Sequence, residues 1–257
     1  DLAGLERLKN WLGVRQRVFA EGGASGLDTP RGLLLLGVQG CGKSMAARVV
    51  AGLWQLPCLR LDMGVLYNKF FGETERNLRE ALRMAEAMAP CVLWIDEIEK
   101  GLGQAVHDEG VSRRGLWSLF TRVGGRQAAV FFVGTAKDIH AFPPELIRKG
   151  RFDEIFFLDL PTAAVRARIL ELHLKKRRQD PACFDLETLA EFSEGFSGAE
   201  LEQTVVAALY RVAAAGAGLD TKALTTAITI TRPLSGIRED DVEALRAWAS
   251  ERCVPAD

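Results

Sequence analysis

The residues best suited to chemistry in this sequence form one short loop, Gly37-Val38-Gln39-Gly40-Cys41-Gly42-Lys43-Ser44. The loop matches G-x-x-x-x-G-K-[ST] at every fixed position, which is the pattern of a phosphate-binding P-loop. The glycines let successive backbone N–H groups turn toward phosphate oxygens, and the helix after the loop adds its positive N-terminal end. The sequence therefore predicts a nucleoside triphosphate as ligand, and the alternative is a glycine-rich turn that binds nothing.

Within this loop, two side chains have distinct predicted roles. We expect Lys43 to reach the β- and γ-phosphates and Ser44 to give its hydroxyl to Mg²⁺, which bridges the same phosphates. The residues of this segment predicted to bind the nucleotide are Gly37, Gly40, Cys41, Gly42, Lys43, Ser44 and Met45. ATP and Mg²⁺ are the expected cofactors.

A pair of carboxylates, Asp96 and Glu97, comes directly after the apolar run Cys91–Ile95. A parallel sheet presents the carboxyl ends of its strands to the ligand, so an aspartate there can hold the Mg²⁺ shell. The next residue, Glu97, can polarise a water for attack on the γ-phosphate. Alone, the pair also fits a strand that runs into a solvated loop. Its place about 50 residues after a P-loop favours the catalytic interpretation.

The apolar pattern predicts a parallel sheet that positions both features. Runs of strand length alternate with helical patterns, as in a doubly wound sheet that helices cover on both faces. The predicted strands are Leu33–Leu36, Cys58–Leu61, Cys91–Ile95, Ala128–Val133 and Ile155–Leu160. The predicted helices between them are Ser44–Trp54, Glu73–Ala87 and Ser112–Val123. A further amphipathic helix is predicted to open the chain, on Leu2, Leu5, Leu8 and Leu12.

After Pro161 the pattern changes, because helical periodicity replaces the strand-like runs. The predicted helices are Ala164–Arg178, Leu186–Ser193, Gly198–Ala215 and Glu239–Ser250. The Thr-rich segment 225–231 is compatible with either a strand or a helix. The sequence therefore predicts an α/β nucleotide-binding domain over residues 1–160 and an α-helical domain over residues 161–257.

The composition narrows the class of protein. The chain of 257 residues has 33 Lys and Arg against 34 Asp and Glu, a net charge of −1, which gives no overall attraction to nucleic acid or anionic membranes. Its 5 cysteines form no C-x-x-C pair, which argues against a disulfide framework. No apolar run approaches the ~20 residues that cross a bilayer. We expect a cytoplasmic protein, or one of the plastid stroma if it comes from an organelle, and its start at Asp1 suggests part of a longer chain.

Further motifs of this sequence are similar to those of one known family. The segments Asp1–Leu5, Lys69–Glu75, Arg148–Asp153 and Gly195–Leu201, together with the two above, are similar to motifs of the AAA+ ATPases. Within that group the sequence resembles the AAA clade, whose members remodel proteins or complexes. Residues 89–100 and 147–161 are most similar to plastid-encoded and cyanobacterial ATPases known as hypothetical chloroplast reading frames. The resemblance implies a five-stranded parallel sheet in the order 5-1-4-3-2 and a small C-terminal α-helical lid.

Two arginines, Arg148 and Arg151, stand in a polar turn ahead of a predicted strand. A planar guanidinium suits phosphate oxygens and the charge that develops on them during phosphoryl transfer. Composition alone equally allows two surface arginines. The resemblance implies that they are arginine fingers, which act on the nucleotide of a neighbouring subunit.

The adjacent aromatic residues Phe70 and Phe71 cannot both face one side of a regular element. One or both can belong to the core. The resemblance instead implies that Phe70, Phe71 and Gly72 form a pore loop that grips an extended polypeptide. Aromatic side chains beside Lys69 could also stack on nucleic-acid bases, but the lack of a basic surplus makes this the lesser option.

The segment around Ser197 has two interpretations. Physically, Ser197 is a good N-cap with Glu200 three residues later, which is the pattern of a capping box. The resemblance implies that Gly198 and Ala199 lie near the adenine and ribose, and that the backbone around Gly4 borders the adenine.

The sequence departs from the clade after Thr135. Most members continue with an asparagine that positions the attacking water, whereas here Ala136, Lys137 and Asp138 come next. Lys137 is the candidate for this sensor position. Lysine cannot accept a hydrogen bond, so Lys137 could contact the γ-phosphate but would orient water poorly. We therefore expect slow or partner-stimulated hydrolysis.

These observations lead to one main hypothesis and two alternatives. The main hypothesis is an ATP-hydrolysing motor that remodels or translocates a protein client as a ring of identical subunits, with a hexamer as the expected form. The first alternative is an ATP-gated scaffold with weak hydrolysis, and the second is a DNA-associated machine. The sequence names neither the client nor the pathway.

Overall fold

The computed structural model describes residues 2–22, 26–64, 71–100, 128–137 and 152–257, without the side chains of residues 71–75. The contacts within the chain divide it into two compact units. The sheet unit comprises Glu6–Gly37, Lys43–Phe157 and Ala249–Asp257, and the helical unit comprises Asp1–Leu5, Val38–Gly42 and Leu158–Trp248.

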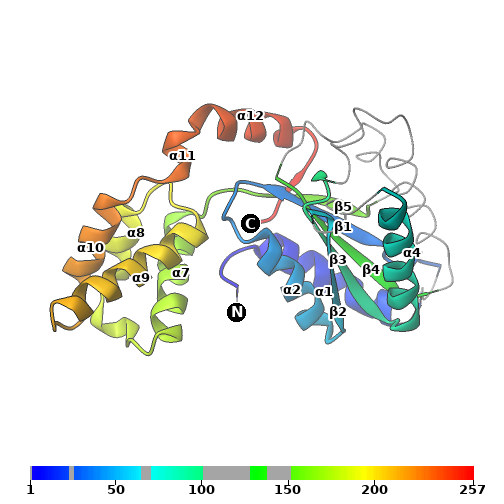
Figure 1. Cartoon of the computed structure of the whole chain (residues 1–257), viewed down its shortest axis with the longest axis horizontal. Coiled ribbons are helices and arrows are strands. Elements are labelled where there is room, and N and C mark those ends of the chain that lie inside the picture. Colours follow the sequence, from blue (N-terminus) through cyan, green and yellow to red (C-terminus); the bar gives the residue numbers. More distant parts are fainter. Residues whose placement is uncertain (1, 23–25, 65–70, 101–127, 138–151) are drawn as a thin grey trace. The chain divides into compact units, whose positions relative to one another are not determined.

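A six-stranded sheet in the order β2-β3-β4-β1-β5-β6 forms the centre of the sheet unit (Figure 1). The strands are β1 (Gly32–Gly37), β2 (Cys58–Asp62), β3 (Cys91–Asp96), β4 (Val130–Thr135), β5 (Glu154–Leu158) and β6 (Val254–Pro255). The pairings β1–β4, β2–β3, β3–β4 and β5–β6 are parallel. The predicted α/β class is confirmed, and the order of the five predicted strands is the observed one.

The sixth strand, β6, is absent from the prediction. It has two residues and pairs with β5, and the Ala256 N–H next to it donates to the Phe157 carbonyl at 3.0 Å. Such a pairing depends on backbone groups alone, so the sequence contains no apolar run that predicts this strand. By contrast, β1, β3 and β4 are buried along their whole length, which is why their sequences read as continuous apolar runs.

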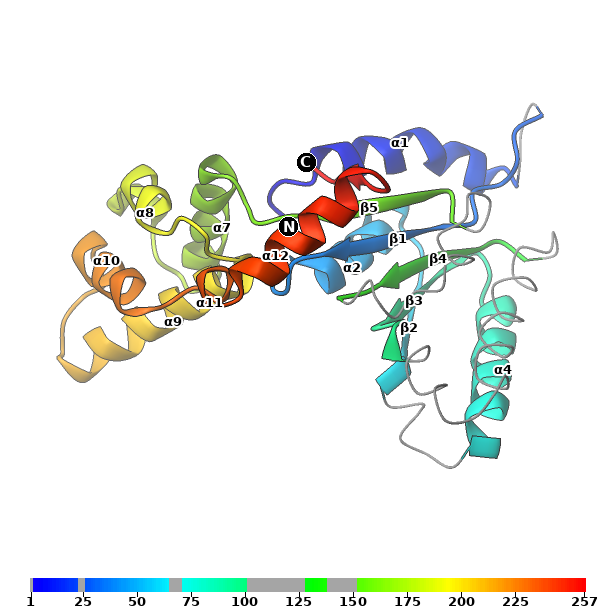
Figure 2. The same ribbon diagram turned by 90° about the horizontal axis from the view of Figure 1, so that it is seen from above.

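Helix α1 (Glu6–Ala20) begins later than predicted. Gly4 and Leu5 have φ angles of 69° and 60°, which lie in the left-handed region and cannot continue a right-handed helix. Helix α1 runs next to β5 (Figure 2), where the Trp11 ring meets Phe156 edge to face at 5.6 Å.

Helix α2 (Lys43–Trp54) packs against α1, because Trp54 stacks on Phe19 with 5.0 Å between ring centroids. Helix α4 (Phe71–Ala87) lies toward the β2 and β3 end of the sheet (Figure 2) and contacts β3. The helix predicted over Ser112–Val123 lies outside the described residues. No helix in the described ranges is long and apolar enough to cross a membrane.

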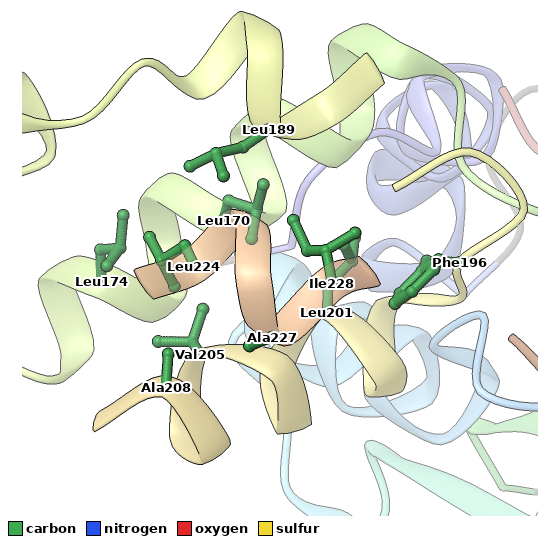
Figure 3. Close-up of a cluster of buried hydrophobic side chains, with 10 residues drawn as sticks. All are labelled: Leu170, Leu174, Leu189, Phe196, Leu201, Val205, Ala208, Leu224, Ala227 and Ile228. Atoms are coloured by element: carbon green, nitrogen blue, oxygen red, sulfur yellow. The ribbon is translucent and has the colours of Figure 1, made fainter. Parts of the chain in front are cut away.

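The helical unit buries an apolar core of its own between α7, α8, α9 and α10 (Figure 3). Its helices are α7 (Ala163–Lys176), α8 (Leu186–Phe192), α9 (Gly198–Ala214), α10 (Thr221–Ile230), α11 (Leu234–Ile237) and α12 (Glu239–Ser250), the last of which continues into the sheet unit. The Thr-rich segment is thus helical. Thr225, Thr226 and Thr229 each donate a hydroxyl hydrogen bond to the carbonyl four residues earlier, which satisfies them inside a helix.

Asp220 caps the start of α10 and stabilises that helix. Its carboxylate accepts a hydrogen bond from the Ala223 N–H at 2.7 Å, so it pairs a helix donor that would otherwise have no partner in the helix. We expect Asp220→Ala to lower the free energy of unfolding by about 0.5–2 kcal/mol in thermal or urea unfolding. Asp220→Asn is the control, because its amide oxygen can still accept the bond. An unchanged midpoint for Asp220→Ala would contradict this role.

Candidate functional site

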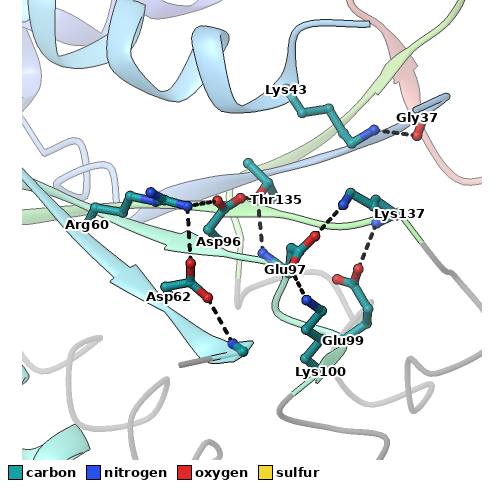
Figure 4. Close-up of polar contacts among 11 residues, drawn as sticks. Gly37, Lys43, Arg60, Asp62, Asp96, Glu97, Glu99, Lys100, Thr135 and Lys137 are labelled. Carbon is teal, nitrogen blue, oxygen red and sulfur yellow. Dashed lines mark hydrogen bonds and ion pairs between the residues drawn. The ribbon is translucent and has the colours of Figure 1, made fainter. Parts of the chain in front are cut away.

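The glycine-rich loop joins β1 to α2. Gly40 and Gly42 have φ angles of 83° and 88°, which glycine adopts without the penalty that a Cβ brings. The Lys43 side chain lies along this loop, because its Nζ donates to the Gly37 carbonyl at 2.6 Å (Figure 4). Lys43 is only 7% exposed, so its charge is held at the loop rather than in bulk water.

These residues fit the phosphates of a nucleotide. Helix α2 begins at Lys43 and has no acidic residue in its first turn, so its N-terminal N–H groups present positive potential without a competing carboxylate. Ser44 is exposed at the same helix start, where its hydroxyl can serve as an oxygen ligand for Mg²⁺. The loop, Lys43 and Ser44 would therefore hold the phosphates and the metal.

The segment Val38–Gly42 of this loop has its contacts within the helical unit. The Ala199 N–H at the start of α9 donates to the Gly40 carbonyl at 3.1 Å. A Cβ at Gly40 would lie 2.5 Å from the Ser197 Oγ, and one at Gly42 would lie 3.7 Å from the Leu2 side chain. Three segments predicted to contribute to nucleotide binding, around Leu2, Gly40 and Ala199, are thus neighbours in this unit.

Ser197 and Glu200 fix the start of α9. The predicted capping box is confirmed, since the Ser197 Oγ accepts from the Glu200 N–H while the Glu200 carboxylate accepts from the Ser197 N–H at 2.8 Å. The other Glu200 oxygen accepts the Leu234 N–H at 2.7 Å, at the start of α11. One carboxylate therefore ties α11 to the helix start that contacts Gly40.

In the sheet unit, Asp96 at the end of β3 is buried and held by two donors. Its Oδ1 accepts from the Thr135 hydroxyl at 2.6 Å, and its Oδ2 accepts from Arg60 Nη2 at 2.7 Å (Figure 4). A carboxylate with both oxygens bonded has a fixed orientation, as a ligand of a metal shell requires.

Arg60 reaches Asp96 because of the strand register. Parallel pairing of β2 and β3 places Arg60 beside Trp94 and Asp62 beside Asp96. Like charges on directly opposed residues repel each other, and Arg60 Nη2 bridges them, at 3.1 Å from Asp62 Oδ2 and 2.7 Å from Asp96. The bond to Asp96 raises the pKa of Arg60. The guanidinium also lies over the Trp94 ring, 4.9 Å from its centroid.

Glu97 has an unusual backbone. Its φ angle is 53°, in the left-handed region that few residues other than glycine occupy. Two hydrogen bonds from β4 hold this turn: the Thr135 Oγ1 accepts the Glu97 N–H at 3.3 Å, and the Thr135 carbonyl accepts the Ile98 N–H at 3.0 Å. Thr135 thus orients the backbone of Glu97 as well as the carboxylate of Asp96.

The Glu97 carboxylate lies between two lysines. Lys100 pairs with its Oε2 and Lys137 with its Oε1 (Figure 4). The hydrogen bond from Lys100, and after it that from Lys137, lowers the pKa of Glu97 below its ordinary value. The candidate sensor Lys137 therefore contacts the candidate base directly.

The side chain of Glu99 holds the backbone of Lys137 in place. The Glu99 Oε1 accepts the Lys137 N–H at 3.2 Å, which fixes the chain just after β4. Burial raises the pKa of Glu99, and among the described residues no donor reaches its Oε2. This partly buried carboxyl is thus part of the scaffold that positions Lys137.

Other predicted site residues lie outside the described parts of the chain. These are Phe70, Arg148 and Arg151, so the pore loop and the arginine fingers stay predictions. Phe71 and Gly72 are described only as the first residues of α4.

Sequence reasoning missed three residues of the acidic cluster. The motifs mark Thr135 only as the last residue before the departure from the clade, and they do not single out Arg60 or Lys100. Arg60 alternates with Asp62 on β2, and Lys100 lies one helical turn after Glu97, which were the available signals. The partner of Arg60 cannot be identified without the register between β2 and β3, whereas Lys100 pairs within its own turn.

Comparison with known proteins agrees with this geometry. Residues 33–160 match the family described as ATPase family associated with various cellular activities (AAA). The chain is 40% identical over 255 residues to the uncharacterized AAA domain-containing protein ycf46 of Pyropia yezoensis, covering 98% of this chain and 52% of that protein. It is 37% identical over 192 residues to the proteasome-activating nucleotidase of Aeropyrum pernix, covering 72% of this chain and 46% of that protein.

A solved structure shares the fold. The FIGL-1 AAA domain in complex with ADP superimposes with a TM-score of 0.80 at 23% identity, covering 98% of this chain and 90% of that one. The chain spans about half the length of the ycf46 relatives that it matches. With its P-loop, its acidic pair and its match to the AAA family and to ycf46 proteins, the chain belongs to the AAA ATPases.

Proposed function

We propose that this chain hydrolyses ATP and is the motor domain of a ring of identical subunits that remodels or translocates a protein client. The observation that carries the proposal is the cluster at the ends of β3 and β4, where Asp96 and Glu97 stand beside Thr135 and Lys137. A fixed buried carboxylate next to a second one supports metal-assisted phosphoryl transfer, in which one carboxylate can hold the metal and the other can activate water.

Each residue has a defined part in the proposed reaction. Lys43 and the loop N–H groups would bind the phosphates, and Ser44 and Asp96 would hold Mg²⁺, which would supply positive charge to stabilise the negative charge of the phosphates. A water oxygen attacks the γ-phosphorus, and the bond to the β,γ-bridging oxygen breaks. Glu97 accepts the proton that the water loses, and the products are ADP and inorganic phosphate.

The proposals of a ring of subunits and of a protein client rest on similarity to the AAA family. Arg148 and Arg151 match the family motif for arginines that act on a neighbouring subunit, and Phe70, Phe71 and Gly72 match its pore loop. The relative from Aeropyrum pernix is a nucleotidase that activates a proteasome. We therefore propose an extended polypeptide as client. The net charge of −1 gives no support to the DNA-associated alternative.

The pairing of Glu97 favours a second candidate, an ATP-gated scaffold with weak hydrolysis. Both oxygens of this carboxylate are bonded to lysines, which leaves it a weaker base than a free glutamate. Steady-state release of phosphate in the presence of Mg²⁺ separates the two candidates. Clear ATP binding with a rate equal to that of buffer would favour the scaffold.

A mixing experiment tests whether the active site is shared between subunits. We expect Arg148→Ala and Glu97→Gln each to be nearly inactive, because one lacks the arginine and the other the base. In mixed rings a Glu97 site can receive Arg148 from its neighbour, so mixing should restore a measurable fraction of the wild-type rate. A mixture that stays as inactive as its components would contradict arginine action between subunits.

A further inference from the structure

One salt bridge of the helical unit has no role in the motifs described above. Arg246 on α12 donates from Nε to both carboxylate oxygens of Asp159, at 3.0 Å and 2.9 Å, and from Nη2 to Oδ1 at 2.9 Å. Contact through two guanidinium nitrogens fixes the relative direction of the two side chains, which a lysine ammonium would not do. The hydrogen bond to Asp159 is the main cause of the raised pKa of Arg246.

The order of the strands explains why these two residues meet. Asp159 directly follows β5, and α12 leads into β6, the strand that pairs with β5. The Asp159 carboxylate also accepts the Leu160 N–H at 2.7 Å, so it orients the backbone that leaves β5. The pair therefore fixes α12 to the segment that follows β5.

The same segment holds the glycine-rich loop. The carbonyl of Leu158, the residue before Asp159, accepts the Val38 N–H at 3.0 Å. Val38 begins the part of the loop that belongs to the helical unit. Further along the loop, Cys41 lies near enough to act electrostatically on Arg246. Contacts thus connect α12, through the backbone after β5, to the loop that is predicted to bind phosphate.

We propose that Arg246 and Asp159 are positioning residues that hold the glycine-rich loop in its phosphate-binding conformation. A loop whose N–H groups are already in place loses less conformational freedom when phosphate binds, so it binds more tightly. Neither side chain needs to touch the nucleotide. The inference rests on the proposed ATPase function, and it assigns part of the nucleotide affinity to α12, a helix far from the loop in sequence.

Asp159→Asn separates this role from a simple effect of charge. Asparagine keeps the shape of the side chain but loses the charge, so its contact with Arg246 weakens. A fluorescent ADP analogue with Mg²⁺ should bind this variant about threefold to tenfold more weakly than wild type. Loss of a negative charge beside a phosphate-binding loop predicts the opposite, tighter binding. An affinity equal to or above that of wild type would overturn the proposal.

A double-mutant cycle shows whether the two residues act as a pair. Arg246→Gln alone should weaken binding of the ADP analogue about as much as Asp159→Asn does, and combining the two substitutions should cause little further loss. Arg246→Lys keeps the charge without the two-nitrogen contact and should resemble Arg246→Gln. Direct contact of Arg246 with the nucleotide predicts instead that the two losses add. Additive losses would overturn the paired role.

Arg238 and Asp241 provide the matched control. They also form an Arg–Asp pair, at 2.6 Å between the Arg238 Nε and the Asp241 Oδ2, and both side chains are exposed. Asp241→Asn removes the same charge from the protein as Asp159→Asn does. It should bind the ADP analogue with the affinity of wild type.

Amide hydrogen exchange, measured by NMR on the protein without nucleotide, tests the loop directly. The Val38 N–H, which is bonded to the Leu158 carbonyl, should exchange about threefold to tenfold faster in Asp159→Asn than in wild type. Exchange at Ile228, in the buried core of the helical unit, should stay unchanged, which separates a local effect from a general loss of stability. Unchanged exchange at Val38 would overturn the positioning role even if the affinity falls.

The two proposals fail in different ways. Wild-type protein that does not bind the ADP analogue would overturn the proposed function, and exchange at Val38 would still test the pair. Wild-type protein that binds the analogue, with Asp159→Asn equal to it in affinity and in exchange at Val38, would overturn the role of the pair alone.

Discussion

Replacing Glu97 by glutamine is expected to lower kcat for ATP by about 10²–10⁴-fold, the usual contribution of a general base. Glutamine has nearly the same shape, but its amide cannot accept the proton that the attacking water loses. The affinity for ATP should stay close to that of wild type, because Lys43 and the glycine-rich loop are unchanged. Phosphate release under single-turnover conditions and equilibrium binding of a fluorescent ATP analogue measure the two quantities.

The chain provides a matched control for this substitution. Glu171 on α7 also lies between two cations, Arg168 and Lys175, and these lower its pKa as Lys100 and Lys137 lower that of Glu97. Glu171→Gln should therefore reproduce any general effect of removing a clamped carboxylate, and its turnover should equal that of wild type. A Glu97→Gln protein that hydrolyses ATP at the parent rate would remove Glu97 from the proposed mechanism.

The second large effect is expected for Lys43→Met, which should weaken ATP binding by about 10- to 100-fold. Lys43 is 7% exposed and its ammonium lies at the loop, so its bonds to phosphate would form where water screens them little. Methionine keeps most of the aliphatic length but has no charge and no donor. Titration with a fluorescent ATP analogue measures the loss.

Two controls show whether weaker ATP binding by Lys43→Met comes from the lost ammonium or from a change in the fold. Lys175→Met removes an exposed lysine of α7 and should bind ATP as wild type does. The thermal midpoint of Lys43→Met shows whether loss of the bond to the Gly37 carbonyl has altered the fold. A folded Lys43→Met protein with wild-type affinity for ATP would refute the assigned role of this loop.

The sequence predicted the buried strands well because a strand that is buried on both faces has a continuous apolar sequence. Strands β1, β3 and β4 have no exposed residue, so their apolar runs can be read without a partner strand. The same reasoning missed β6, whose two residues pair through backbone groups, and it began the first helix too early. Gly4 and Leu5 turn the chain in the left-handed region, a choice that apolar spacing does not encode.

The candidate site was predicted only in part, for a related reason. Motif spacing marks Lys43, Asp96 and Glu97, because each must stand at a strand end or helix start. The partners of the carboxylates come from elsewhere: Arg60 from a neighbouring strand and Lys137 from beyond β4. Their contacts depend on strand register and on the turn at Glu97, which a single sequence does not specify.

The position of Trp94 makes intrinsic tryptophan fluorescence a useful probe of changes at Asp96. Trp94 is 2% exposed, and two guanidinium groups lie near its ring, with Arg48 at 5.5 Å and Arg60 at 4.9 Å from the ring centroid. Arg60 in turn bonds to Asp96, so any ligand that draws this arginine away changes the electric field at the indole. Intrinsic fluorescence, compared between wild type and Trp94→Phe, therefore gives a label-free optical signal from the immediate surroundings of the metal-binding carboxylate.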